Sequence, residues 1–169
     1  GGSQTKAGSR WHQPQIDAIV HELKILKGNG FDGTVGVVTP FKEHAKRIRD
    51  AAYRVLGSRT VTNWDFLSST VDQFQGGEKD LILFGLIGGG EVKNPTPAFY
   101  MKSLNRFNVA VSRAKHVLHV FGDSSWAKSC DVKVLRHLVQ IALARPKDQS
   151  YEVRKDLIGP VWEPALAKQ

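Results

Sequence analysis

Apolar side chains recur every three to four residues in the first third of the chain and again near its end. This spacing is typical of amphipathic helices that bury one face. Pro14 suits the first turn of the first helix, and the run Gly28, Asn29 and Gly30 ends it. The helices predicted in this way are residues 13–27, 41–56 and 132–144.

Short runs of consecutive apolar residues alternate with these helical patterns. Such runs are typical of strands that are buried on both faces. The predicted strands are residues 34–38, 68–71, 81–87 and 117–121, with a loop at 88–97 and a helix at 104–115. Strands that alternate with helices predict an α/β fold, in which a mainly parallel sheet is covered on both sides in three layers.

The composition fits one globular domain with an anionic partner. The chain has 169 residues, of which 41% are hydrophobic, and a formal net charge of +8. This charge favours nucleic acid over a membrane as partner, although a domain that is merely basic stays an alternative. The single cysteine, Cys130, excludes an internal disulfide framework and a cysteine-cluster zinc site, so we expect a reducing, cytoplasmic compartment.

The ends of the chain differ in composition from its middle. We expect residues 1–10 to be a disordered tag or linker, residues 11–145 to form the domain, and residues 146–169 to be a linker or the start of a further domain. Because the sequence opens with Gly-Gly-Ser and not with Met, we expect a fragment of a longer protein.

The run VGVVTPFKEHAKRI places polar groups where a strand gives way to a helix. The predicted strand ends near Thr39, Pro40 breaks it, and the helix follows. Ligands of open α/β sheets bind at the carboxyl ends of strands, so the Thr39 hydroxyl and the first helical amides could meet a phosphate. A helix start without a ligand is the alternative.

The run STVDQFQGGEKD is the most informative segment of the chain. Thr70 and Asp72 close a strand, and Phe74 is expected in the core. The Gly76-Gly77 pair allows positive φ and a close approach of the backbone to a ligand. Two polar neighbours could contact the same ligand, since Gln75 could donate to a phosphate and Glu78 could accept from a ribose hydroxyl. A plain strand–turn–strand connection is the alternative.

The run RFNVAVSRAK places an arginine just before an apolar strand. On a helix, Asn108, Ser112 and Lys115 would share one side and Val109 the other. Arg113 is a candidate arginine finger, a guanidinium that offsets charge growing on a transferring γ-phosphoryl group. A surface arginine in a basic helix is the alternative.

Taken together, the three runs resemble motifs IV, V and VI of the superfamily 1 helicases. The resemblance covers roughly residues 33–123 and is to the second RecA-like domain, in the branch of the nonsense-mediated-decay RNA helicase and the Okazaki-fragment nuclease-helicase. It implies nucleic-acid contacts from Thr39, Pro40, Thr70, Val71 and Asp72. It implies ATP contacts from Gln75, Gly76, Gly77, Glu78 and Arg113, with Arg113 catalytic, and a role for Asn108 and Ser112 in supporting the fold beside the site.

The chain also departs from this helicase pattern. Gly77 stands where the branch usually has arginine, and the upstream Gln-Tyr-Arg-Met segment is absent. No G-x-x-x-x-G-K-[ST] phosphate cradle and no acidic Walker B pair is present. Because these helicases bind ATP between two RecA-like domains, we expect this chain alone to hydrolyse no ATP.

The resemblance also predicts cofactors and partners. ATP and Mg²⁺ are expected in the complete protein, with no metal ligand from this chain. The expected partners are the first RecA-like domain of the same chain and single-stranded nucleic acid, DNA favoured over RNA, with no membrane.

Two other classes of function remain open from the sequence. Asp80 with Glu91 and Lys93 loosely matches the metal site of a Mg²⁺-dependent nuclease. A non-catalytic binding or docking module could use the basic helix 41–56 and three tryptophans that stack on bases, namely Trp11, Trp64 and Trp126. His116 and His119 are expected to be structural and not metal ligands.

Overall fold

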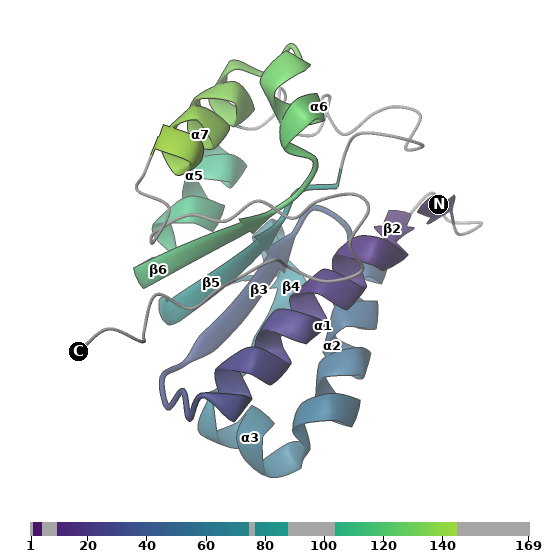
Figure 1. Cartoon of the computed structure of the whole chain (residues 1–169), viewed down its shortest axis with the longest axis vertical. Coiled ribbons are helices and arrows are strands. Elements are labelled where there is room, and N and C mark those ends of the chain that lie inside the picture. Colours follow the sequence, from purple (N-terminus) through teal and green to yellow (C-terminus); the bar gives the residue numbers. More distant parts are fainter. Residues whose placement is uncertain (1, 5–9, 75–76, 88–103, 145–169) are drawn as a thin grey trace.

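The computed structural model describes residues 2–4, 10–74, 77–87 and 104–144 of the chain. Its centre is a sheet of four strands in the order β4-β3-β5-β6, and every neighbouring pair is parallel (Figure 1). The predicted α/β class with a parallel sheet is therefore confirmed. The strands are β3 (Val35–Thr39), β4 (Leu67–Thr70), β5 (Lys79–Gly85) and β6 (Ala114–Phe121).

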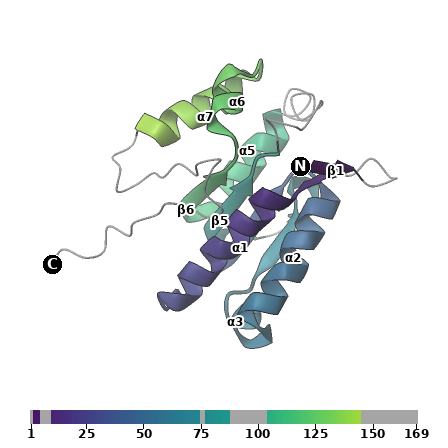
Figure 2. The ribbon, with the colours of Figure 1, turned by 45° about the vertical axis from the view of Figure 1, so that its right-hand side comes forward.

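Helices cover both faces of this sheet (Figures 1 and 2). One face carries α1 (Gln13–Gly28), α2 (Lys42–Leu56) and α3 (Ser58–Asn63). The other carries α5 (Leu104–Ser112) and α7 (Lys133–Ala144), with α6 (Ser124–Ser129) packed against α7.

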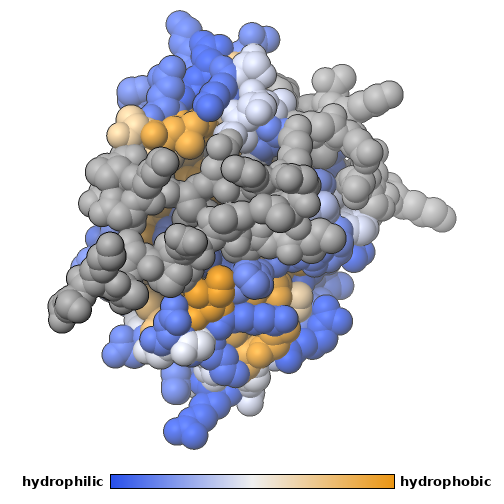
Figure 3. All heavy atoms as spheres, viewed as in Figure 1, coloured by the Kyte–Doolittle hydropathy of each residue, from blue (hydrophilic) through white to orange (hydrophobic). Residues whose placement is uncertain are grey.

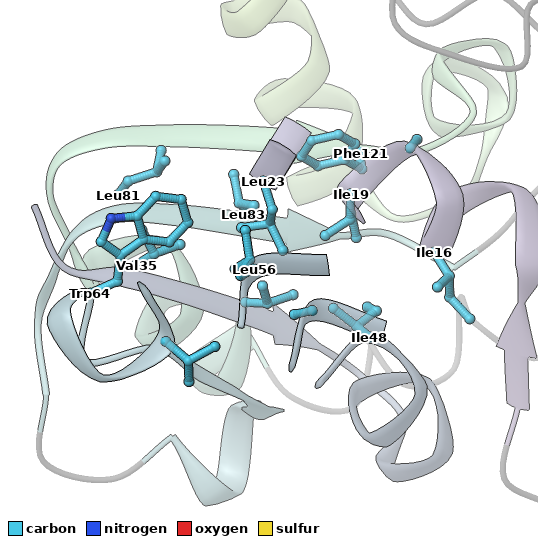
Figure 4. Close-up of a cluster of buried hydrophobic side chains, with 14 residues drawn as sticks. Ile16, Ile19, Leu23, Val35, Ile48, Leu56, Trp64, Leu81, Leu83 and Phe121 are labelled. Carbon is cyan, nitrogen blue, oxygen red and sulfur yellow. The ribbon is translucent and has the colours of Figure 1, made fainter. Parts of the chain in front are cut away.

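Successive residues of β5 belong to different cores. Leu81 and Leu83 pack with α1 and α2 in one buried cluster (Figure 4). Ile82 and Phe84 pack in the cluster on the α5 side. Side chains alternate across a strand, so a continuous apolar run fills both cores. Complete burial of each large apolar side chain contributes roughly 1.5–3 kcal/mol, and the two cores together hold the sheet between its helical layers.

Trp64 closes one end of the first core and is almost fully buried. Its indole Nε1 donates to the carbonyl oxygen of Phe31 at 2.8 Å, and the two rings meet edge to face with centroids 5.8 Å apart. Trp11 lies under the guanidinium of Arg47, whose Cζ is 4.1 Å from the ring centroid. Both tryptophans therefore already have packing partners within the chain.

The predicted helix over 104–115 was wrong at its carboxyl end. Helix α5 stops at Ser112, and Ala114 already pairs with Lys79 as the first residue of β6. Lys115 consequently lies on a strand and does not share a helix side with Ser112. The pairing of β6 with β5 provides backbone hydrogen bonds that a longer helix would forgo.

Residues 2–4 and 10 of the amino-terminal segment, for which disorder is predicted, belong to the described part of the chain. Strand β1 (Gly2–Gln4) pairs antiparallel with β2 (Arg10–His12), and the backbone N–H of His12 donates to Nδ1 of His44 at 3.3 Å. The expectations for the loop at 88–97 and for residues 146–169 fall outside the described residues. Across the described ranges, no helix combines the length and the apolar character needed to cross a membrane.

Candidate functional site

The candidate residues divide between the two edges of the parallel sheet. Thr39 ends β3 and Thr70 ends β4, so both lie at the carboxyl edge. Gly77 and Glu78 precede β5 and Arg113 precedes β6, so these residues lie at the amino edge. The run STVDQFQGGEKD therefore starts at one edge of the sheet and ends at the other.

At the carboxyl edge, Thr39 and Thr70 are direct partners in the β3–β4 register. Thr39 is fully buried, and its hydroxyl has no hydrogen-bond partner among the described residues. Thr70 is also buried, and its hydroxyl lies 3.4 Å from Oε1 of Gln73. Pro40 and Val71 are buried as well, whereas Asp72 is exposed. The edge therefore combines one exposed acidic residue with threonine hydroxyls that lie beneath the surface.

Two further buried polar side chains surround the same edge, and sequence reasoning missed both. Gln15 of α1 donates through Nε2 to the carbonyl oxygens of Leu86 at 2.7 Å and Phe121 at 3.0 Å, just beyond β5 and at the end of β6. His44 of α2 is fully buried, and its Nε2 has no partner. Burial, aided by the charge of His12, lowers the pKa of His44 to about 3, so its imidazole is neutral. A glutamine on the apolar side of a predicted helix was the available signal for Gln15.

At the amino edge, strand pairing brings Glu78 and Arg113 together. The backbone N–H of Lys79 donates to the carbonyl oxygen of Arg113 at 2.9 Å, and Lys79 pairs with Ala114. Glu78 is exposed and Arg113 is half-buried, with a buried Nε that has no hydrogen-bond partner. Gln75 and Gly76 lie outside the described residues. The edge thus presents a carboxylate and an incompletely bonded guanidinium from adjacent strands.

Lys79 fixes the backbone at this amino edge and was not singled out from the sequence. Its side chain is buried, and Nζ bonds both the carbonyl oxygen of Asp65, at 2.6 Å, and the Asp65 carboxylate. Asp65 has a positive φ of 43°, which an aspartate tolerates better than most residues. The α3–β4 connection is thereby tied to the start of β5.

Asn108 and Ser112 are both exposed and lie four residues apart on one side of α5. The Ser112 hydroxyl donates to the carbonyl oxygen of Val109 at 3.2 Å, within the same helix. Val109 and Ala110 pack against the second core. These contacts anchor the helix that leads directly into Arg113.

The side chain of Asp80 accepts hydrogen bonds from Thr34, which fits a structural role. One carboxylate oxygen accepts from the backbone N–H and the hydroxyl of Thr34, both at 2.7 Å. These hydrogen bonds, followed by the charges of Lys115 and His116, hold the pKa of Asp80 below its usual value, against the opposing effect of burial. Glu91 and Lys93, the other members of the possible nuclease site, lie outside the described residues.

The two strand histidines pair with carboxylates from other elements. His116 Nε2 lies 3.7 Å from an oxygen of Asp80, and His119 Nδ1 lies 3.3 Å from an oxygen of the buried Glu22. Within the described ranges, no group of three or more His, Cys, Asp or Glu side chains is placed to hold a metal ion.

Comparison with known proteins places this geometry in a family context. The family described as "AAA domain" matches residues 2–125. Helicase SEN1 of Saccharomyces cerevisiae is 34% identical over 116 residues, covering 68% of this chain and 5% of the relative. DNA polymerase alpha-associated DNA helicase A of the same yeast is 28% identical over 133 residues, covering 78% of this chain and 18% of the relative.

A third relative extends the similarity to a human protein. The DNA replication ATP-dependent helicase/nuclease DNA2 of Homo sapiens is 32% identical over 88 residues, covering 52% of this chain and 8% of the relative. The chain therefore spans a small part of the length of each of these relatives, between 5% and 18%.

Proposed function

The chain belongs to the AAA domain family, within the superfamily 1 helicases, and from that premise we propose that it is the second RecA-like domain of an ATP-dependent helicase or translocase. In this role it supplies one wall of the ATP cleft and half of the channel for a single strand. The observation that carries the proposal is the separation of the candidate residues onto two edges of one parallel sheet.

The amino edge is the proposed ATP wall. Glu78 is open to solvent and would accept from a ribose hydroxyl, while Arg113 would face the γ-phosphoryl group. The unpartnered Nε of Arg113 supports this assignment, because a guanidinium with unused donors suits the planar oxygens of a phosphate. Mg²⁺ would enter with the nucleotide, and none of its ligands is assigned to this chain.

The arginine would act mainly through electrostatics. Charge on the transferred phosphoryl group grows toward the transition state, and a positioned guanidinium offsets it without having to reorganise. The hydrogen bond from Lys79 to the Arg113 carbonyl and the burial of Lys79 against Asp65 hold the backbone on which this geometry depends. Asn108 and Ser112 would support the same segment through α5.

The carboxyl edge is the proposed strand channel. Thr39 and Thr70 are adjacent, and Pro40, Val71 and Asp72 directly follow them in the chain. The buried Thr39 hydroxyl without a partner is the group that a backbone phosphate would satisfy once the covering side chains shift. We propose single-stranded DNA in preference to RNA, since one relative above is named a DNA helicase and another a DNA replication helicase/nuclease.

The test uses the complete protein that contains this domain. ATP hydrolysis stimulated by a single strand is measured for wild type, Arg113→Ala and the control Arg59→Ala, which removes an exposed arginine from α3. We expect Arg113→Ala to lower the rate by about 10³-fold or more while strand binding is kept, and Arg59→Ala to change neither. An unchanged rate in Arg113→Ala would remove its catalytic role.

The isolated chain provides a second test. Because the sequence contains no phosphate cradle, the chain incubated with ATP, Mg²⁺ and a single strand should show no turnover. Robust hydrolysis that survives further purification would contradict the assignment of this chain to one wall of a shared cleft.

A non-catalytic strand-binding module is the second candidate function. It is favoured by the exposed basic residues of α2, which need no nucleotide to attract a polyanion. Such a module predicts salt-sensitive strand binding together with a complete absence of strand-stimulated ATP hydrolysis in the longer protein.

A further inference from the structure

Helix α2 carries a straight line of exposed residues along its outer side. Lys42, Lys46, Arg49 and Tyr53 are all exposed and follow one another at intervals of four, three and four residues. Residues at this spacing lie above one another on a helix. We call these four residues the α2 stripe. It extends for about 16 Å, since each helical residue rises about 1.5 Å.

The cations of the α2 stripe are poorly neutralised. The ammonium groups of Lys42 and Lys46 form no hydrogen bond or ion pair with the described residues, and Arg49 has only a loose contact of 3.7 Å to Asp50. Arg47, on the neighbouring side, is held by Glu43 at 2.8 Å. Like charges four residues apart destabilise a helix by a few tenths of a kcal/mol, so the stripe gains from an external anion.

A groove borders the α2 stripe. It lies between α1 and α2, has a volume of about 700 Å³, and is open to solvent. Ile16, Val20 and Ala51 contribute apolar lining, and Tyr53 lines it with a side chain that is 50% exposed. Figure 3 shows apolar surface in orange between hydrophilic atoms in the lower half of this face, where α1 and α2 lie.

The groove and the α2 stripe differ in their charge. The groove is lined by the carboxylates of Asp17, Glu43 and Asp50 and by the cations of Lys46, Arg47 and Arg54, so its charges balance, whereas the stripe carries three cations and no carboxylate. An acidic peptide placed inside the groove would therefore meet carboxylates as well as cations. In a nucleic-acid strand the negative charge lies on the phosphates, whereas the bases are neutral. The phosphates could therefore lie along the exposed cations of the α2 stripe while a base enters the groove. A tyrosine ring beside cations is a common arrangement for stacking an unpaired base.

The α2 stripe starts next to the proposed strand channel. Lys42, its first member, lies three residues after Thr39, and α2 begins at the carboxyl edge of the sheet and runs away from it (Figures 1 and 2). A strand that leaves the channel at Thr39 therefore meets Lys42 first and Tyr53 last. This contact of the strand with the α2 stripe uses none of the candidate ATP-binding residues at the amino edge of the sheet.

We propose that the α2 stripe binds the backbone phosphates of a single strand beyond the channel, and that Tyr53 stacks on one of its bases at the groove. This inference rests on the proposed function, because it takes the strand from the carboxyl edge. It gives the domain a second contact region, which begins within the run VGVVTPFKEHAKRI and continues beyond it to Tyr53.

The test compares two strand lengths by fluorescence anisotropy. Oligothymidylates of about six and about 16 nucleotides, the shorter sized for the channel alone, are titrated against the whole chain at several salt concentrations. The test variant is Lys42→Gln/Lys46→Gln/Arg49→Gln. The control variant, Lys24→Gln/Lys128→Gln/Lys133→Gln, removes the same charge from exposed positions elsewhere.

The proposal makes quantitative demands on these titrations. The test variant should bind the longer strand at least about tenfold more weakly than wild type. The slope of the logarithm of its binding constant against the logarithm of the salt concentration should become shallower by about two, since each phosphate contact contributes roughly 0.7 to this slope for single strands. Binding of the shorter strand and all binding by the control variant should stay close to wild type. Tyr53→Ala should weaken binding of the longer strand by at least about fivefold without changing how that binding depends on the salt concentration.

Other outcomes would overturn the proposal in distinguishable ways. Equal loss in the test and control variants would show a general charge effect and not a stripe. If the test variant binds the longer strand as tightly as wild type does, the stripe does not bind the strand, while the proposed channel is not affected. If the wild type binds neither length, the proposed function fails as well. Competition by polyglutamate at matched charge would assign the stripe to an acidic protein instead.

Discussion

The buried, neutral imidazole of His44 should make the fold less stable in mild acid, because only the unfolded chain takes up a proton at this side chain there. The side chain is fully buried beside β2, accepts from the His12 backbone through Nδ1, and leaves Nε2 without a partner. Its pKa in the folded chain is lowered from 6.5 to about 3. The unfolded chain therefore binds a proton between these two values that the folded chain rejects, so stability must fall as the pH falls below about 6.5.

The size of this effect follows from the two pKa values. Well below pH 6.5, each further pH unit lowers the free energy of unfolding by about 1.4 kcal/mol, until the folded imidazole itself titrates near pH 3. Between neutral pH and pH 5, His44 alone should therefore lower the free energy of unfolding by about 2 kcal/mol. For a domain of this size such a loss is a substantial part of the total stability.

Urea denaturation at pH 7.5 and at pH 5 would measure this contribution. His44→Asn keeps an acceptor for the His12 N–H and removes the titrating group, so its loss of stability between the two pH values should be about 2 kcal/mol smaller than that of wild type. His21→Asn, which replaces an exposed histidine of α1, serves as the control. An identical pH dependence in wild type and His44→Asn would refute the reasoning.

Three further predictions concern the contacts that residues of the run STVDQFQGGEKD make with the rest of the domain. Phe74 is almost fully buried, so Phe74→Ala should lower the free energy of unfolding by about 3–5 kcal/mol, and Phe74→Leu by clearly less, in urea titrations. Gly36→Ala should cost about 1–3 kcal/mol, because its new Cβ would lie 2.6 Å from the Phe74 ring, and a wild-type melting temperature would contradict this. Thr34→Val removes the hydroxyl donor to Asp80 and should raise the pKa of that carboxyl in a carbon-detected NMR titration, whereas Thr34→Ser should not.

Local signals in the sequence predicted most of the regular structure. The periodicity of α1 and the apolar runs of β3 and β5 are properties of neighbouring residues, so they can be read without knowing the fold. Helix α3 was missed because only Val61 of its six residues is buried, too few to show a period. Helix α6 was also missed, although Asp123 caps it through Oδ1 at 3.0 Å from the Trp126 nitrogen.

The candidate site was less accessible from the sequence because its geometry is set by distant pairing. The end of α5 and the start of β6 depend on the bond between Lys79 and Arg113, which are 34 residues apart. A lysine before a strand also resembles a surface charge, and only the fold shows that Asp65 covers it. The roles of the individual site residues stay predictions.

The path of the run STVDQFQGGEKD has a mechanical consequence. Thr70 and Glu78 lie at opposite edges of the sheet, yet they are only eight positions apart in the chain, and Phe74 between them is buried in the core. A pulling force applied to a strand held near Thr70 would reach the opposite edge through this short segment. On the proposed function, the time for which the nucleotide stays bound should therefore depend on tension in the strand. A single-molecule experiment with the complete motor under load would measure that dependence.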